Sequence, residues 1–180
     1  MNEKKSILKK ITASREASLL IVLIVLCIAI TAKSPSFMTA KSISDMLKNN
    51  AVIMIMALGM LGVLLVGGID ISVASTLSFS GMTVGMLMKN RVVTSTTLLF
   101  LIAVAVGAAC GLVIGLVIAY GKVIPIIATM GFMYIYRGMA YLISNSEWAS
   151  AENLGTFKNF ALGKTLGLNN VIWVTIICYV

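Results

Sequence analysis

The chain has 180 residues, of which 59% are hydrophobic and 11% are charged, and its mean hydropathy is +1.04. A soluble domain of this length needs far more polar surface around its core, so the composition excludes that class and indicates an integral membrane protein made mostly of helices. The net charge of +8 lies in the N-terminal leader and in short connections. It forms no basic face interleaved with aromatic residues, so nucleic acid is not an expected partner.

Residues 1–16 form a basic leader, which the positive-inside rule keeps in the cytoplasm. An uncharged run over residues 17–32 follows and predicts the first membrane helix. A cleaved signal peptide has the same pattern, but the many later apolar runs favour a retained helix. The polar stretch 33–50 begins with KSPSF, in which Pro35 disfavours a helical conformation at Ser34.

The next apolar runs cover residues 51–69 and 71–88, and the second run ends at KNR, residues 89–91. The uncharged run 92–121 is longer than the roughly 20 residues that cross a bilayer, so part of it lies at an interface or the helix tilts. Lys122 and Pro125 then open a helix expected over residues 126–144.

Residues 145–168 read as a polar loop, long enough for a short surface helix, in which Trp148 suits the headgroup level. The final apolar run, residues 171–180, is too short to cross a bilayer. We therefore expect the chain to be a piece of a longer protein that stops within its sixth helix.

Asp70 and Arg137 are charged residues placed within or between apolar runs, with no polar loop around them. A lone charge at the bilayer centre costs at least about 2.5–3.5 kcal/mol, so such residues usually face a cavity or each other. In one interpretation GGID is a tight interfacial turn, with Asp70 capping a helix that begins at Ile71. In the other, a broken helix at membrane depth lines a water-filled path.

The two interpretations place Arg137 differently. It lies twelve residues beyond Pro125, roughly 18 Å along a helix. If the spans simply alternate with the leader inside, the GGID turn and Lys122 are cytoplasmic and Arg137 lies in the outer half, out of reach of Asp70. If Asp70 lies mid-membrane, the pair becomes reachable and the KNR segment returns to the cytoplasm, which satisfies the positive-inside rule better. The sequence leaves both arrangements open.

Small residues recur at every fourth position of the run 92–121. These positions drift slowly around one face of a helix and leave a groove that another backbone can approach closely. They predict tight helix–helix contact rather than chemistry. The members of this small-residue ladder are Ala103, Gly107, Gly111, Gly115 and Ala119.

The chain offers no expected catalytic, metal or cofactor site. It has no histidine, which excludes catalytic triads and imidazole ligands. Cys27, Cys110 and Cys178 lie far apart in apolar runs, without the spacing of a metal site or a disulfide framework. The GKT at residues 163–165 lacks the earlier glycine of a phosphate loop, because that position is Lys158.

Two segments carry a resemblance to a known family: GGIDISVAS at residues 67–75 and GLVIGLVIAYGKVIPIIATMGFMYIYRGMAYLIS at residues 111–144. The sequence resembles the membrane permeases of bacterial ABC importers for ribose-type sugars, a branch that also takes up rhamnose, other simple sugars and the autoinducer-2 signal. The shared motifs are the glycine–aspartate hairpin, the Gly-Lys-x-x-Pro helix start and the Arg137–Gly138 pair. The resemblance runs from about Ser42 to the end, and YRG with the downstream Trp148 leans towards the autoinducer-2 and rhamnose members.

Three positions depart from the pattern of that family. Ile114 stands where asparagine is frequent, Ile124 where a second proline is frequent, and Ala74 where glycine is usual. Each is a conservative packing change, except that the missing asparagine removes a polar contact that bears on ligand preference.

The resemblance implies an all-α fold, a polytopic transmembrane helical bundle of the type II ABC importer permease kind. Residues 17–180 would be the N-terminal portion of this membrane domain, in the bacterial inner (plasma) membrane with a cytoplasmic N-terminus. Such permeases dimerise, receive sugar from an extracytoplasmic binding protein and couple to cytoplasmic ATPase subunits. The chain would thus be a translocation subunit rather than an enzyme, with ATP hydrolysed by a partner. In members of that family the loop that docks the ATPase lies in the second half of the chain, so these residues alone are not expected to transport.

A substrate path between helices, near Asp70 and the helix opened by Pro125, follows from the resemblance. In it Asp70 orients the hairpin and Arg137 lies near an outer vestibule. Two other hypotheses are an ion-coupled secondary transporter, in which Asp70 binds a proton or cation, and a non-transporting scaffold packed through the small-residue ladder. The candidate path residues are Gly67, Gly68, Asp70, Ser72, Pro125, Thr129 and Arg137.

Overall fold

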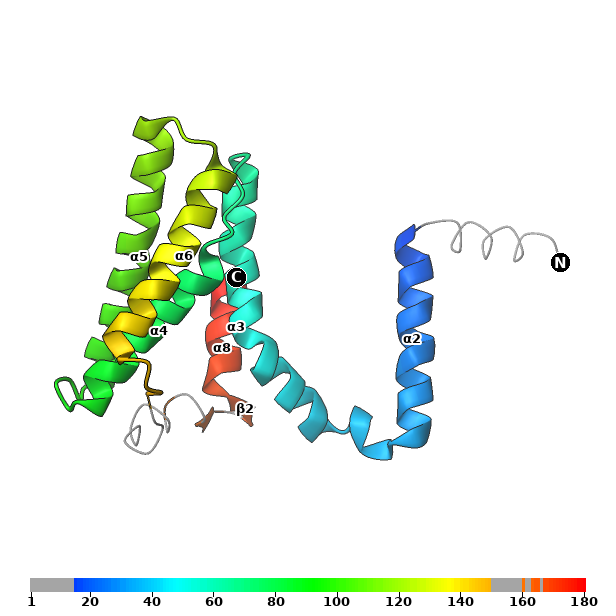
Figure 1. The fold of residues 1–180 in the computed structure, drawn as a ribbon. Coiled ribbons are helices and arrows are strands. Elements are labelled where there is room, and N and C mark those ends of the chain that lie inside the picture. Colours follow the sequence, from blue (N-terminus) through cyan, green and yellow to red (C-terminus); the bar gives the residue numbers. More distant parts are fainter. Residues whose placement is uncertain (1–14, 150–159, 161–162, 166) are drawn as a thin grey trace. The chain divides into compact units, whose positions relative to one another are not determined.

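The computed structural model of the chain is a set of helices joined by short connections (Figure 1). It describes residues 15–149, 160, 163–165 and 167–180. The predicted leader, residues 1–16, falls almost entirely outside this part. The chain forms two compact units, residues 1–49 and residues 50–180, and each is described by itself below.

The first unit contains α2 (Arg15–Lys33), the 3₁₀ turn η1 (Pro35–Met38) and the start of α3 (Ala40–Leu65). The helix α2 covers the predicted first span, and its leucine, isoleucine and valine side chains are exposed, as a lipid-facing helix requires. The predicted break at KSPSF is confirmed, because α2 ends just before Pro35.

The helix α3 begins eleven residues before the apolar run predicted at residue 51. The hydroxyl of Thr39 explains this early start. Its Oγ1 accepts a hydrogen bond from the backbone N–H of Ser42 at 3.3 Å, as an N-cap residue does. A capped first turn lets the helix continue through the polar residues 40–50 into the apolar run.

The second unit contains the rest of α3, then α4 (Val73–Lys89), α5 (Thr96–Gly121), α6 (Pro125–Ser144) and α8 (Asn170–Tyr179). The last expected apolar run is thus a helix, and Pro125 occupies the first turn of α6, where its missing N–H costs nothing. Two short antiparallel strands, β1 (Lys164–Thr165) and β2 (Leu168–Asn169), interrupt the otherwise all-α fold. The surface helix expected in residues 145–168 falls mostly on residues 150–159, outside the described part.

Within the described residues, three helices are long and apolar enough to cross a membrane: α3, α5 and α6. The helix α5 begins at Thr96, so four residues of the run 92–121 precede the helix, and its 26 residues still exceed the roughly 20 that cross a bilayer. The helix α4 is not among the three. It has 17 residues, starts two residues later than the predicted span 71–88 and carries several serine and threonine residues. The apolar run therefore yields a shorter, more polar helix than expected.

The core of the second unit lies where α4, α5 and α6 meet (Figure 1). The phenol of Tyr136 on α6 donates a hydrogen bond to the backbone carbonyl of Cys110 on α5 at 2.9 Å, and its ring stacks on Phe79 of α4 with centroids 6.0 Å apart. Ser80 of α4 donates to the carbonyl of Ala103 on α5 at 2.8 Å. Close packing and interhelical hydrogen bonds of this kind hold helices together in a membrane, where lipid is as apolar as the side chains.

The α3–α4 connection is a tight turn followed by an extended segment. The N–H groups of Gly67 and Gly68 bond back to the carbonyls of Leu64 and Val63 and close the end of α3, and Gly67 has the positive φ of 75° that such a helix end requires. The Asp70 carboxylate then accepts two hydrogen bonds from Ser72, from its N–H at 2.8 Å and from its hydroxyl at 2.6 Å. Asp70 therefore closes a turn before α4, and the prediction that it caps a helix starting at Ile71 is wrong by two residues.

The direction of α4 relative to α6 follows from contacts near its two ends. At its start, the Ile69 carbonyl lies 3.4 Å from the hydroxyl of Thr129, one turn into α6. At its end, Lys89 forms an ion pair with Glu147, just beyond α6. The helix α4 thus runs parallel to α6, with the GGID turn and the KNR segment at opposite ends of the bundle. Because α5 separates α4 from α6 in both predicted arrangements, these two helices run in the same direction in each, and the choice between the arrangements stays a prediction.

Replacement of Gly85 by alanine is expected to destabilise the bundle. A Cβ atom at Gly85 would lie 2.6 Å from the Cβ of Ala149, whereas one at Gly81, a turn earlier on α4, would meet nothing within 4 Å. Overpacking costs about 1–3 kcal/mol, which offsets or exceeds the gain of about 1 kcal/mol in helix propensity. Thermal unfolding in detergent should show a lower Tm for Gly85→Ala and an equal or higher Tm for Gly81→Ala. Equal shifts in the two variants would contradict the contact.

The turn at Asp70 is expected to need an acceptor oxygen rather than a charge. Asp70→Asn keeps an oxygen for both donors of Ser72, whereas Asp70→Ala leaves them without their partner. Hydrogen bonds to a charged group contribute about 1.5–3 kcal/mol, so the alanine variant should lose stability on that scale and the asparagine variant distinctly less. Unfolding of both variants in the same detergent measures the difference. An asparagine variant as unstable as the alanine variant would show that the charge itself is required.

Candidate functional site

The seven candidate path residues fall into two places in the second unit. Six of them, here called the hairpin cluster, lie around the α3–α4 connection and the first turns of α6. The seventh, Arg137, lies eight residues beyond Thr129, about 12 Å further along α6. The members of the hairpin cluster are Gly67, Gly68, Asp70, Ser72, Pro125 and Thr129.

The hydroxyl groups of the hairpin cluster are buried between helices. Ser72 and Thr129 are 0% and 1% exposed. The Ser72 hydroxyl donates to Asp70, its carbonyl accepts from the hydroxyl of Ser75 at 2.7 Å, and the Thr129 hydroxyl contacts the carbonyls of Ile69 and Ile126. These hydroxyl groups already have hydrogen-bond partners within the protein. The hairpin cluster is therefore a joint that fixes where α4 begins, with Ser72 and Thr129 buried and its other members partly or fully exposed.

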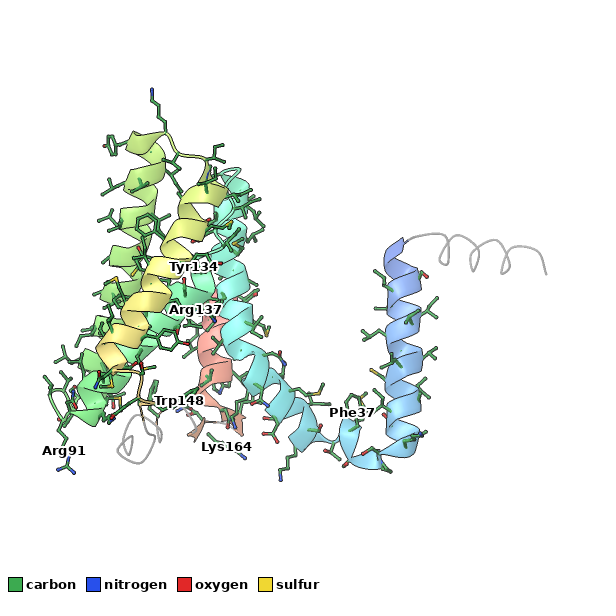
Figure 2. The ribbon with its side chains drawn as sticks, viewed as in Figure 1. Phe37, Arg91, Tyr134, Arg137, Trp148 and Lys164 are labelled. Carbon is green, nitrogen blue, oxygen red and sulfur yellow. The ribbon has the colours of Figure 1, made fainter. Side chains whose placement is uncertain are left out.

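A cavity of about 400 Å³ lies between α4 and α6, at the end of the bundle away from the hairpin cluster. Arg137 is the cationic residue in its wall, and Figure 2 shows it within the length of α6, with Trp148 beyond the end of that helix. The wall combines hydroxyl groups, aromatic rings and this guanidinium, which suits a polar solute of modest size. The lining residues are Ser78, Met82, Arg137, Ala140, Tyr141, Ser144, Ser146, Glu147 and Trp148.

Arg137 and Asp70 do not form a pair. In the described part of the chain the carboxylate that pairs with a cation is Glu147, and its partner is Lys89. The hydrogen bond from Lys89 and its positive charge hold the pKa of Glu147 below its usual range. A lowered pKa means that the pair is formed at neutral pH and is lost only as the pH falls through the acidic range. Among the described residues Arg137 forms no ion pair, and the Glu147 carboxylate that lines the same cavity is paired with Lys89.

Sequence reasoning named Arg137 and Trp148 but missed the rest of the cavity wall. On α4, Ser78 and Met82 are four residues apart, and on α6, Arg137, Tyr141 and Ser144 recur at spacings of four and three. Residues at these spacings share a helix face. These spacings were the signal available in the sequence for a shared face on each helix. Nothing in the sequence shows that the two faces meet.

The small-residue ladder lies along α5, and its first member, Ala103, accepts a hydrogen bond from Ser80 of α4. A Cβ atom added at Gly107, Gly111 or Gly115 would contact nothing within 4 Å. The buried residues Cys110 and Ile114 lie beside Ala103 and Gly107 on the helix, so only the later members of the ladder turn away from this packed face. The tight contact predicted from the ladder stays a prediction. Among the described residues no three His, Cys, Asp or Glu side chains form a group that could hold a metal ion.

Comparison with known proteins identifies the family. A family model described as the permease component of branched-chain amino acid transport systems matches residues 42–179. The ribose import permease protein RbsC of Escherichia coli (strain K12) is 33% identical over 162 residues, which cover 88% of this chain and 50% of RbsC.

Two further relatives have similar coverage. The L-arabinose ABC transporter permease protein AraH of Azospirillum brasilense is 32% identical over 91% of this chain and 48% of its own length. The autoinducer 2 import system permease protein LsrD of Escherichia coli O9:H4 (strain HS) is 31% identical over 91% of this chain and 50% of its own length.

The chain spans about half the length of these curated relatives. No solved structure gives a significant match. The resemblance to permeases of ribose-type ABC importers is confirmed, because three differently named members of that group match most of the chain. The family model covers residues 42–179, and the chain therefore belongs to the family of membrane permease components described as branched-chain amino acid transport system permeases.

Proposed function

We propose that this chain contributes to the membrane-spanning permease subunit of an ATP-driven ABC importer for a sugar or a sugar-like solute. The observation that carries the proposal is the match of 88–91% of the chain to permeases named for ribose, L-arabinose and autoinducer 2. The structure supports it with apolar helices that suit a bilayer and with a polar-walled cavity between two of them. Its task is translocation, and hydrolysis of ATP belongs to separate cytoplasmic subunits.

The α4–α6 cavity is the part of the path that we assign to solute. Hydroxyl and guanidinium donors can satisfy the oxygens of a polyhydroxylated molecule, and an aromatic ring suits its apolar face. The hairpin cluster has a different task in this proposal. Because Asp70 holds Ser72 and Thr129 contacts the Ile69 carbonyl, the cluster orients the α3–α4 connection and sets the start of the cavity-forming helix.

The partners and the orientation follow from the same proposal. We assign the alternating arrangement, with a cytoplasmic leader and a first crossing before α3, in which the GGID turn lies in the cytoplasmic half and the mouth of the cavity lies outside. An extracytoplasmic binding protein would then deliver solute on the side of Trp148, and ATPase subunits would act from the other side. A second permease copy completes the assembly, and the small-residue ladder of α5 is the face we assign to close contact with another helix.

The energy source of uptake tests the proposed function. The full-length permease that contains this chain should be expressed with ATPase subunits and a binding protein in cells that lack other sugar importers. Uptake of radiolabelled ribose, arabinose and autoinducer 2 should then be measured. An ATPase variant unable to hydrolyse ATP should abolish uptake, whereas collapse of the proton gradient at constant ATP should leave it intact. The opposite result would support an ion-coupled transporter, and uptake of no solute would favour a scaffold.

Arg137 is expected to contribute to transport through its hydrogen bonds to solute. Arg137→Gln should lower kcat/KM of uptake roughly 10- to 100-fold, the factor for losing a charged hydrogen bond worth about 1.5–3 kcal/mol, and Arg137→Lys should lie between. Tyr134→Phe is the matched control, because Tyr134 lies three residues away on α6, is 64% exposed and does not line the cavity. Equal uptake by Arg137→Gln and Tyr134→Phe, at equal membrane abundance, would remove Arg137 from the path.

A further inference from the structure

The helix α3 is longer than the bilayer core that it crosses, and its charged residues lie at one end. Its 26 residues extend about 39 Å, whereas the hydrocarbon core of a bilayer is about 30 Å thick. The charged residues of α3 are Lys41, Asp45 and Lys48, and residues 49–65 carry no charge. Because charged side chains avoid the hydrocarbon, the surplus length belongs to residues 40–48, which therefore lie at the level of the lipid headgroups.

This first part of α3, residues 40–48, is amphipathic. Ile43, Met46 and Leu47 follow the i, i+3, i+4 spacing of one helix face, and their side chains are 41–47% exposed. Lys41 and Lys48 lie on the opposite side, about 140–160° around the helix from Ile43. Among the described residues neither lysine forms an ion pair. Residues 40–48 thus present an exposed apolar face on one side and a cationic face on the other.

A short turn keeps this segment close to the end of α2. Six residues, 34–39, separate the two helices, and four of them form the 3₁₀ turn η1. Met38 of that turn and the last turns of α2 line an apolar groove of about 610 Å³, and none of its described lining residues is charged. Phe37, beside Met38, is half-buried (Figure 2). The connection therefore adds apolar side chains directly before the amphipathic part of α3.

The polar side of the segment has an excess of positive charge. Lys41, Asp45 and Lys48 together carry +1, and Lys33 in the last turn of α2 adds a further cation. Lysine stems extend along apolar surface and bring their ammonium groups to the headgroup level, where anionic lipids attract them. An apolar face and cations at one depth match the two parts of an anionic phospholipid, its acyl chains and its phosphate.

We propose that residues 33–48 form a membrane-surface element that binds anionic phospholipid. Its apolar face, Ile43, Met46 and Leu47, contacts the acyl chains, and Lys41 and Lys48 contact the phosphates. A helix that enters the headgroup region obliquely makes both contacts, because one of its sides faces the hydrocarbon and the other faces water. The element holds the start of α3 at the bilayer surface. This inference goes beyond the proposed function and does not depend on the solute or on the energy source.

The depth of two neighbouring positions tests the apolar face. Leu47→Cys and Asn49→Cys are introduced singly into the full chain, in which Cys27→Ala and Cys178→Ala remove the more accessible native thiols. Both positions are exposed in the structure, but they lie about 160° apart on the helix.

Each variant is labelled with a bimane fluorophore and reconstituted in vesicles of phosphatidylcholine and phosphatidylglycerol, with or without bromine atoms on the acyl chains. Bromine is expected to quench the fluorophore at position 47 at least about twofold more strongly than at position 49, because an amphipathic helix at the bilayer surface buries its apolar face near the acyl chains. The parent without an introduced cysteine gives the background from buried Cys110.

The kind of lipid tests the cationic face. Vesicles of equal parts phosphatidylcholine and phosphatidylglycerol are prepared with bromine on only one of the two lipids. Brominated phosphatidylglycerol should quench the fluorophore at position 47 roughly two- to fivefold more strongly, the factor for attraction of anionic lipid to a lysine at the surface. Lys41→Gln with Lys48→Gln should remove this preference. Lys122→Gln is the matched control, because Lys122 is an exposed lysine in the connection between α5 and α6.

Different results would overturn each part of the proposal. Strong quenching at both positions would mean that the segment is immersed on all sides, and weak quenching at both would mean that protein, such as a second copy of this chain, covers position 47. No preference for phosphatidylglycerol, or a preference that survives the double lysine variant, would remove the cationic face. Equal melting temperatures across the series exclude unfolding as the cause of any change. None of these results bears on whether uptake depends on ATP, so the importer proposal stands or fails separately.

Discussion

The hydrogen bonds that hydroxyl side chains donate to backbone carbonyls are the interaction on which this bundle depends. In an apolar surrounding a polar group must find its partner within the protein, and the contact between two helices is most specific where it supplies one. Tyr136 bonds to the Cys110 carbonyl, Ser80 to that of Ala103, and Thr129 contacts that of Ile69. Together they join α4, α5 and α6 at three levels and set the position of α4 between its neighbours.

The two ends of α6 serve different purposes as a result. At its start, buried hydroxyls and the Asp70 turn leave little free space, and the chain geometry is set by bonds that are already formed. At its other end, α4 and α6 enclose a cavity whose wall contains a guanidinium, hydroxyl groups and an aromatic ring. The buried joint and the polar-walled cavity therefore lie towards opposite ends of α6.

Family membership indicates the class of transporter, whereas the geometry indicates which residues line a cavity and which hold the helices together. The relatives are named for different solutes, ribose, L-arabinose and autoinducer 2, and each matches 88–91% of this chain. The structure separates the motifs around Asp70, Pro125 and Arg137 into a packing joint and a cavity wall. Arg137 and its neighbours on the cavity wall are therefore the residues at which variation among solutes is expected to matter, while Asp70, Ser72 and Thr129 are expected to be needed for any solute.

Composition and periodicity determined the membrane class, the order of the helices, the break at Pro35 and the start of α6 at Pro125, because these depend on local hydrophobicity and on proline geometry. They could not determine that α3 starts at Ala40, since that depends on one capping hydroxyl, or that α4 is short and parallel to α6. The pairing of Lys89 with Glu147 and the meeting of Ser78 with Arg137 across one cavity join residues more than fifty positions apart. Only the tertiary structure decided them, because hydrophobic patterns show which face of a helix is polar but not which other helix that face meets.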